Sequence, residues 1–232
     1  MIFHYQGGLA PVFNSFLPVV VGYLIGSFPT AFLAVRWRTR LDIRKTGSGS
    51  VGTLNSYLVT RSKAVAVTVL LVDVLKGAVA VLVGQTFVPG LPFVGAAVAG
   101  MAAVIGHCYP IWLRFRGGRG LATAAGAMGV MSLPVVGAWM AAWAIGYAFT
   151  RAVNVASLIA CILVLGLLTT VPDDVVRAVL PEGATTRGLR AIGVMILIVM
   201  MTRLIGPFRE YLRSQKARRT SARATAEGGE VS

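Results

Sequence analysis

The stretch from Gly77 to Leu113 decides the fold class: it reads GAVAVLVGQTFVPGLPFVGAAVAGMAAVIGHCYPIWL and contains no charged residue. It lies between Lys76 and Arg114, and a proline-rich turn at 89–92 interrupts it. A membrane-spanning helix needs about 20 apolar residues. The stretch therefore supplies the second half of one spanning helix and all of another.

The rest of the chain has the same character. Its 232 residues are 56% hydrophobic and 13% charged, with a mean hydropathy of +0.76. Soluble domains are about 25% charged, so an ordinary soluble domain is excluded, and the apolar content excludes low-complexity disorder. Cys108 and Cys161 lie in apolar stretches, which favours buried hydrophobic side chains over a disulfide framework. We expect a polytopic membrane protein of one domain.

Uncharged runs, separated by basic or turn-forming residues, predict an all-α protein with about seven transmembrane helices. The expected helices cover residues 14–36, 63–86, 92–113, 119–131, 134–150, 153–171 and 189–206. Residues 1–212 are expected to form a single transmembrane domain. The basic segment 213–232 is expected to be a disordered cytoplasmic tail.

The distribution of basic residues predicts the orientation. Most of the 22 Lys and Arg residues fall in the tail and in the connections on one side of the predicted bundle. The positive-inside rule places that side in the cytoplasm, with the N-terminus outside and the C-terminus inside. The first segment lacks a basic n-region, so no cleaved signal peptide is expected. The net charge of +14 follows from this topology without any nucleic-acid motif, and we expect contact with anionic lipid headgroups, not with nucleic acid.

Glycines alternate with hydroxyl residues in the first cytoplasmic connection, which reads RKTGSGS over residues 44–50. Glycine lets successive backbone N–H groups turn inward as an anion nest, while hydroxyls and an arginine add donors and charge. The same composition also suits a polar turn between helices. The candidate phosphate-binding residues here are Arg44, Gly47, Ser48, Gly49, Ser50 and Asn55.

A second cytoplasmic connection reads FRGGRG over residues 115–120 and opens the next predicted helix. Backbone N–H groups at a helix N-terminus, together with an arginine fork, suit a phosphate. The lysine and spacing of a Walker A loop are missing, and a tight glycine turn is the alternative. The candidates here are Gly117, Gly118, Arg119, Gly120 and Thr123.

Other polar residues lie within or beside the predicted helices. Asn154 and Ser157 share one face at the start of a helix, where they suit either substrate binding or a bond to a neighbouring helix. Asp73 and Lys76 lie three residues apart in the second span and can form an ion pair; a packing role and a proton or ion path both remain open. The cytoplasmic connections contain no carboxylate cluster and no metal-spaced His/Cys set, so we expect no metal and no nucleotide–Mg²⁺ chemistry.

Taken in order, these segments resemble one known family. The matching pieces are Gly26-Ser27, DIRxxGSG from residue 42, DxxKG from residue 73, GHxYP from residue 106, FxGGRGxAT from residue 115 and RxVxxxS from residue 151. This pattern is similar to the bacterial membrane acyltransferases that transfer an acyl chain from acyl phosphate to glycerol 3-phosphate. The resemblance covers roughly residues 20–160.

The resemblance implies a multi-pass enzyme of the bacterial inner membrane that acts in phospholipid biosynthesis, with its active site on the cytoplasmic face and no cofactor. The products would be lysophosphatidic acid and phosphate. Acyl phosphate has a good leaving group, and donors in the site would stabilise the developing oxyanion and the departing phosphate. Ser48, His107 and Arg119 become the catalytic candidates, although His107 is equally suited to orienting the loop. The other residues named above become substrate-binding candidates.

Several positions depart from the family pattern. Ser50 stands where the family has Asn, Arg119 replaces a Lys and so changes reach and geometry, and Leu58 replaces an Arg that Arg61 can substitute for. At the end of the last helix, Thr202-Arg203 lacks the His and Asn that help to hold glycerol 3-phosphate. Two alternatives therefore remain: a diverged acyltransferase with a different acceptor, and a non-enzymatic transporter or lipid-binding protein, which the charged pair in the second span motivates.

Overall fold

The computed structural model describes residues 10–180 and 183–228, and within these ranges the chain forms helices joined by turns and loops, with no strand. Long apolar runs become helices because backbone N–H and C=O groups must be paired within the segment in lipid. Six helical stretches in these ranges are long and apolar enough to cross a membrane: Phe16–Thr39, Lys63–Gly84, Pro92–Leu113, Leu133–Thr150, Val153–Thr170 and Thr186–Ala217. The prediction of an all-α membrane protein is confirmed.

A further apolar helix, Leu121–Met131, is shorter than these six. Its 11 residues rise about 16 Å, roughly half of the 30 Å hydrocarbon core of a bilayer. The expected count of seven spans therefore depends on how this helix sits in the membrane, and it stays a prediction.

The first expected span is broken. Helix α1 (Ala10–Ser27) ends before Phe28-Pro29, and α2 (Thr30–Thr39) begins directly after it. Proline has no backbone N–H and disfavours helical geometry in the preceding residue. The sequence predicted one helix over 14–36, and the break at Pro29 corrects it.

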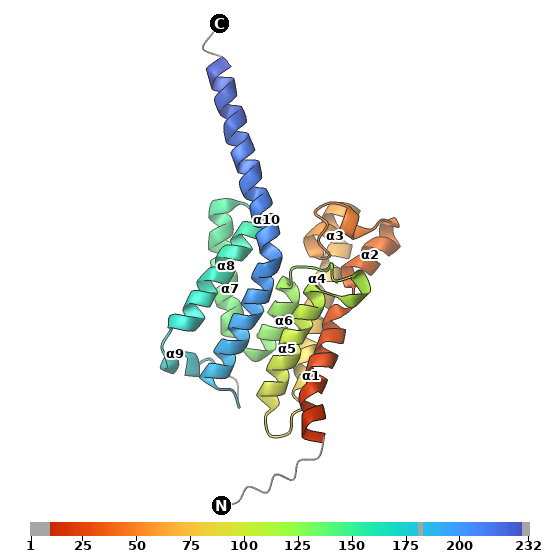
Figure 1. Ribbon diagram of the computed structural model, residues 1–232, viewed down its shortest axis with the longest axis vertical. Coiled ribbons are helices and arrows are strands. Elements are labelled where there is room, and N and C mark those ends of the chain that lie inside the picture. The colour runs from red at the N-terminus through yellow and green to blue at the C-terminus, as the bar shows by residue number, and fades with distance from the viewer. Residues whose placement is uncertain (1–9, 181–182, 229–232) are drawn as a thin grey trace, which may run out of the picture.

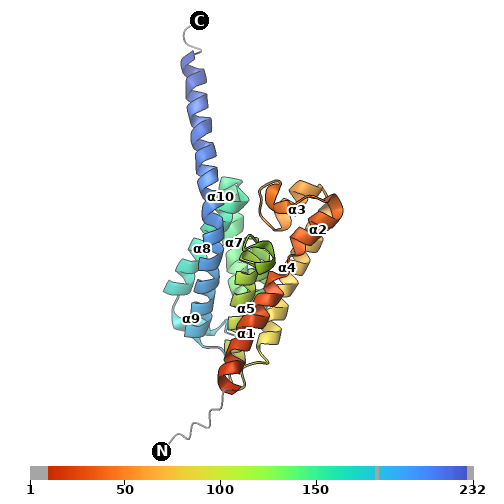
Figure 2. The same ribbon diagram turned by 45° about the vertical axis from the view of Figure 1, so that its right-hand side comes forward.

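The remaining elements follow in chain order. They are η1 (Ile43–Lys45), α3 (Thr53–Thr60), α4 (Lys63–Gly84), α5 (Pro92–Cys108), η2 (Ile111–Leu113), α6 (Leu121–Met131), α7 (Leu133–Thr150), α8 (Val153–Thr170), α9 (Asp173–Arg177) and α10 (Thr186–Gly228). The helices form two groups (Figures 1 and 2). In the first, α4 and α5 pack on each other and on both α1 and α6; in the second, α8 packs on both α7 and α10. Helix α10 also contacts α5 and so joins the groups.

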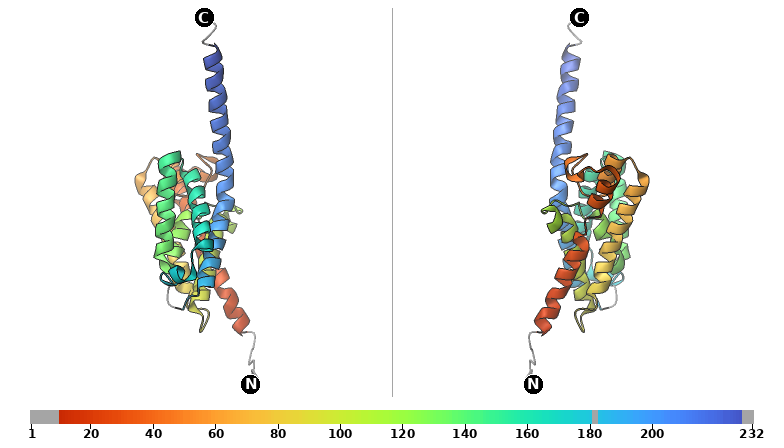
Figure 3. Two further views of the ribbon diagram at one scale, coloured as in Figure 1. Left: turned by 90° about the vertical axis from the view of Figure 1, so that its left-hand side faces the viewer. Right: turned by 90° about the vertical axis from the view of Figure 1, so that its right-hand side faces the viewer.

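Helix α10 continues for 43 residues and projects well beyond the bundle (Figures 1 and 3). The sequence predicted disorder from residue 213, whereas the structure continues the helix to Gly228. Arg, Lys, Ala, Gln and Glu, which favour helices, dominate this segment. Adding residues to an existing helix avoids the unfavourable nucleation step. Residues 229–232 of the predicted tail lie outside the described residues.

Small residues bring the first group of helices close together. A Cβ atom at Gly22 or Gly26 of α1 would lie within 2.3 Å of a backbone oxygen of α5. A Cβ atom at Gly77 of α4 or at Gly126 of α6 would lie within 2.0 Å of a backbone oxygen of the other helix. Such close helix approach is typical of membrane proteins. It places the charged part of α4 directly beside α6.

The loop between α2 and α3 has its own small apolar core. Ile43 and Val51 of the loop are buried together with Val35, Val69 and Leu113. Burial of a Val or Ile side chain contributes about 1.5–3 kcal/mol. This anchoring fixes the loop against α4 and η2, next to the connection between α5 and α6.

Candidate active site

A cavity of about 630 Å³ lies between α3, α4 and α6 on one side and α7, α8 and α10 on the other. Asp73, His107, Arg119 and Ser157 line its polar end. Its apolar part is lined by side chains that include Met128, Val135, Val136, Trp139, Val164, Leu168, Ile196 and Leu197. Because α6 begins beside Arg119 and ends near Val135 and Val136, the charged and apolar regions lie at opposite ends of this helix. The shape suits a ligand with an anionic head and a long apolar chain.

Arg119 supplies the positive charge of the cavity. Its side chain is half-buried, and in the part of the chain that the structure describes it has neither an ion-pair nor a hydrogen-bond partner. Burial, followed by the nearby positive charge of Arg203, lowers the pKa of Arg119 from its ordinary value. An arginine stays protonated in a protein despite such a shift. A desolvated, unpaired guanidinium of this kind favours an anionic ligand.

The glycines before Arg119 are used for packing. The N–H groups of Gly117 and Gly118 donate to the carbonyl oxygens of Cys108 and His107, at 3.2 and 3.1 Å. A Cβ atom at Gly118 would lie 2.1 Å from Nε2 of His107. These two amides are therefore engaged with the end of α5, contrary to a nest in which they face an anion. Gly120, with φ +82°, turns the chain into α6, and Gly120, Leu121 and Ala122 line the cavity.

Arg203 of α10 holds the same loop from the other side. Its Nε donates to the carbonyl oxygen of Gly118 at 3.1 Å and its Nη2 to that of Gly117 at 3.0 Å. The guanidinium also lies over the ring of Tyr109, 5.2 Å from the centroid. Sequence reasoning missed this contact, and the available signal was an arginine within the apolar stretch 191–206 of the last helix.

His107, near the end of α5, lines the cavity beside α4. Its side chain is buried, and Nδ1 is 3.8 Å from Oδ1 of Asp73. The same carboxylate oxygen is 2.8 Å from Nζ of Lys76, which confirms the predicted ion pair within α4. Lys76 also donates to the carbonyl oxygen of Phe28 at 3.2 Å, at the break between α1 and α2.

Asn55 organises the loop between α2 and α3. Its Nδ2 group lies within hydrogen-bonding distance of the carbonyl oxygens of Ile43, Thr46 and Ser50 at 3.0–3.1 Å, and its Oδ1 accepts from the N–H of Ser48 at 2.8 Å. Asn55 is only 2% exposed. Its amide is therefore satisfied by the loop, which makes Asn55 a positioning residue.

The glycine and serine candidates of this loop surround Asn55 and do not line the cavity. Gly47 has φ +63°, and a Cβ atom there would lie 2.2 Å from Oδ1 of Asn55. Gly49 has φ +70° and packs against the carbonyl of Arg44. Ser48 is exposed. The cavity is lined instead by the residues that follow the loop, Gly52, Thr53, Leu54 and Tyr57.

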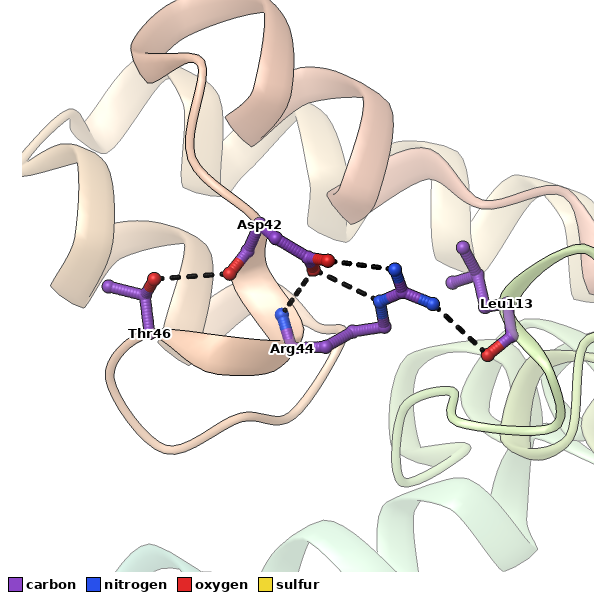
Figure 4. A network of polar contacts seen from close by, with 4 residues as sticks. All are labelled: Asp42, Arg44, Thr46 and Leu113. Atoms are coloured by element: carbon purple, nitrogen blue, oxygen red, sulfur yellow. Dashed lines mark hydrogen bonds and ion pairs between the residues drawn. The ribbon is translucent and has the colours of Figure 1, made fainter.

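Arg44 is paired within the loop, as Figure 4 shows. Its Nη2 lies 2.7 Å from Oδ2 of Asp42, and its Nη1 donates to the carbonyl oxygen of Leu113 at 3.3 Å. The guanidinium lowers the pKa of Asp42 to about 2, and the carboxylate in turn raises that of Arg44. Arg44 thus joins the loop to η2 and is already neutralised by a carboxylate.

The remaining candidates have different surroundings. Ser157 lines the cavity, and its hydroxyl donates to the carbonyl of Val153 at 2.8 Å, which leaves its lone pairs available. Thr123 and Asn154 do not line the cavity, although a buried oxygen of each side chain lacks a hydrogen-bond partner. Arg61 ends α3 in left-handed geometry and is exposed, so it does not reach the cavity either.

Residues 16–213 match the profile of the family described as glycerol-3-phosphate acyltransferase. The chain belongs to this family. A glycerol-3-phosphate acyltransferase from Gluconobacter oxydans is 42% identical over 149 residues, which cover 64% of this chain and 70% of the relative. A second one, from Synechococcus elongatus, is 38% identical over 168 residues and covers 69% and 79% of the two chains.

Solved structures agree with this assignment. The crystal structure of PlsY, an integral membrane glycerol 3-phosphate acyltransferase, in its glycerol 3-phosphate form superposes with a TM-score of 0.71 at 26% identity, over 87% of this chain and 93% of that one. The lysophosphatidic acid form gives a TM-score of 0.69 at 25% identity. The protein is therefore a multi-pass membrane acyltransferase, and the resemblance inferred from the motifs is confirmed.

Proposed function

We propose that this protein transfers an acyl chain from acyl phosphate to glycerol 3-phosphate and releases lysophosphatidic acid and inorganic phosphate. The observation that carries the proposal is the cavity in which unpaired Arg119 lies at the head of an apolar slot. An acyl phosphate has this pattern of an anionic head on a hydrocarbon chain. The proposal is also supported by the names of the relatives and by the two ligand forms of PlsY.

The chain's own residues suggest how the donor binds. Arg119 and the N-terminal end of α6, whose helix dipole is positive, bind the phosphoryl group. The acyl chain lies in the apolar slot between α6, α7, α8 and α10. Burial of each methylene contributes about 0.8 kcal/mol, so a long chain fixes the reactive carbonyl near the polar end.

The reaction is an acyl transfer between two oxygens. The hydroxyl of glycerol 3-phosphate attacks the acyl carbon, a new ester C–O bond forms, and the bond from that carbon to the phosphate oxygen breaks. His107 lies in the wall of the polar end, where it is placed to accept the proton of the attacking hydroxyl and to pass it to the departing phosphate. Holding two anions beside Arg119 offsets their mutual repulsion and supplies proximity.

We place the polar end of the cavity on the cytoplasmic face of the bacterial inner membrane. Helices α2 and α3 and the projecting part of α10 lie at one end of the bundle, opposite α9 (Figure 1). This end carries most of the basic residues, as the positive-inside rule requires for a cytoplasmic face. It supports the predicted orientation, with an outer N-terminus; seven spans and one transmembrane domain to residue 212 belong to the same proposal.

The test is the release of phosphate by detergent-purified protein given palmitoyl phosphate, with and without glycerol 3-phosphate. Release that requires glycerol 3-phosphate and yields lysophosphatidic acid is expected. Arg119→Gln is expected to abolish it, whereas Arg116→Gln, which removes an exposed charge of the same loop outside the cavity, is the matched control. Release that does not depend on glycerol 3-phosphate would identify a different acceptor, and no release would overturn the proposal.

A further inference from the structure

The buried ion pair of α4 lies at the polar end of the cavity, which Asp73 lines and Lys76 does not. The side chains of Asp73 and Lys76 are 3% and 7% exposed. Burying two charges is costly, and a buried pair is weak evidence of added stability. The proposed reaction assigns neither side chain a contact with substrate. Their retention inside a membrane helix therefore calls for a role.

The contacts of the pair run in one direction, from the broken first span to the cavity. Lys76 reaches the carbonyl oxygen of Phe28 at 3.2 Å and the carboxylate of Asp73 at 2.8 Å. Asp73 in turn faces Nδ1 of His107 at 3.8 Å. Asp73 and His107 line the cavity, whereas Lys76 does not.

The geometry is that of a histidine oriented by a carboxylate. We propose that Asp73 is a positioning residue for His107, and that Lys76 fixes Asp73 in place through its charge and its bond to Phe28. This inference rests on the proposed function, because it is through His107 that the pair affects acyl transfer. It differs from the two other roles considered for the pair, which were helix packing and an ion path.

The role follows from the two nitrogens of an imidazole. A carboxylate opposite Nδ1 favours the tautomer that carries the proton there. The other nitrogen, Nε2, then lies against the Gly118 segment that leads into Arg119. Without Asp73 the imidazole can take either tautomer. In part of the molecules Nε2 would then carry the proton and could not accept one from the attacking hydroxyl.

Lys76 has a separate task. A buried carboxylate without a counter-ion is strongly unfavourable, so Asp73 needs a cation that does not enter the cavity. The bond from Lys76 to Phe28 keeps the ammonium group on the far side of Asp73 from substrate. This arrangement leaves Arg119 as the cation that lines the cavity.

The deciding experiment compares the double variant Asp73→Asn/Lys76→Met, which removes both charges, with the wild type. The chain has only two histidines, His4 and His107, so the background His4→Gln leaves His107 as the only imidazole signal. We measure melting temperature, kcat, KM for glycerol 3-phosphate, and the tautomer of His107 by nitrogen-15 NMR. Asp173→Asn/Arg190→Gln, which removes the 2.8 Å ion pair of α9 and α10, is the matched control.

The double variant is expected to melt within about 4 °C of the wild type and to lose about 10- to 100-fold in kcat, with KM little changed. Its His107 signal shifts from one tautomer to a mixture, while the control retains wild-type kcat. Wild-type kcat and an unchanged tautomer in the Asp73→Asn/Lys76→Met protein would overturn the inference and leave the pair a packing role. Lys76→Met alone is expected to give less folded protein than the double variant.

A second variant, which keeps both charges, tests the inference even if the double variant folds poorly. Asp73→Glu retains the ion pair and displaces the carboxylate relative to Nδ1, and it is expected to show the same fall in kcat. Wild-type kcat in Asp73→Glu, together with an unchanged tautomer, would also overturn the inference. The tautomer reading is independent of turnover. Failure of the wild type to transfer an acyl chain would thus reject the proposed function without deciding the role of Asp73.

Discussion

The guanidinium of Arg203 donates through Nε to the carbonyl oxygen of Gly118 at 3.1 Å, across 85 residues of sequence. The last long helix therefore holds the turn that presents Arg119 to the cavity. An arginine fork can bind two neighbouring carbonyls at once, which a lysine cannot do in the same geometry.

Replacing Arg203 by Lys is expected to lower kcat/KM on the order of 100-fold, because small displacements of a positioned group have effects of this size. Steady-state kinetics with glycerol 3-phosphate measure the change. Arg209→Lys is the matched control, since Arg209 lies on the same helix, is exposed and does not line the cavity. Equal activity of the two variants would show that the contact is dispensable.

Gly47→Ala is expected to destabilise the loop between α2 and α3 by about 1–3 kcal/mol, since the residue is in left-handed geometry and its Cβ atom would clash with Asn55. Gly90→Ala shares the positive φ but meets no atom within 4 Å, so it isolates the cost of backbone strain, about 1–2 kcal/mol. Thermal unfolding and activity measure both variants. A Gly47→Ala protein as active and stable as Gly90→Ala would contradict the role given to Asn55.

The Asp42–Arg44 pair predicts a defined pH dependence. The pKa of Asp42 is lowered to about 2, so its contribution to stability is complete above the ordinary value of about 3.9 and is lost as pH falls through about 2. The stability difference between wild type and Asp42→Asn is expected to be constant from pH 8 to about pH 4 and to shrink below it. Denaturant titrations across this range measure it. A difference that already declines between pH 7 and pH 5 would exclude the pair as its source.

The apolar slot is expected to accommodate the acyl chain. Val136→Trp narrows the far end of the slot and is expected to reduce activity with a long-chain acyl phosphate far more than with a short-chain one. Val130→Trp, on an α6 position outside the cavity, is the control for added bulk. Competition between a long-chain and a short-chain donor gives the ratio of the two activities directly. An equal loss of activity with both donors would place the acyl chain outside this slot.

The sequence was sufficient to predict most of the helices, because charged and apolar residues segregate so strongly in membrane segments. The break at Pro29 could also have been recognised, since proline disfavours helix in the residue before it. Two other prolines, Pro18 and Pro207, lie inside continuous helices. Local sequence therefore does not decide which proline interrupts a span.

The site was predicted less completely. Glycine-rich segments suggested anion nests, but Gly117 and Gly118 are needed for close packing on His107. Whether a glycine serves anion binding or close packing depends on residues outside its own segment. Asn55 binds within its own loop, and Arg44 pairs with Asp42 two residues away before it reaches Leu113. The role of Arg203 depends on contacts across 85 residues, which no local pattern encodes.

The break in the first span has a consequence for the order of membrane insertion. The carbonyl oxygen of Phe28 accepts from the N–H of Thr30 at 3.0 Å and also from Nζ of Lys76 at 3.2 Å, 48 residues later in the chain. A charged side chain inside a membrane is costly unless it is paired, and the break supplies one of the partners of this ammonium group. We therefore expect α4 to reach its final position in the bilayer only where the broken first span already lies beside it.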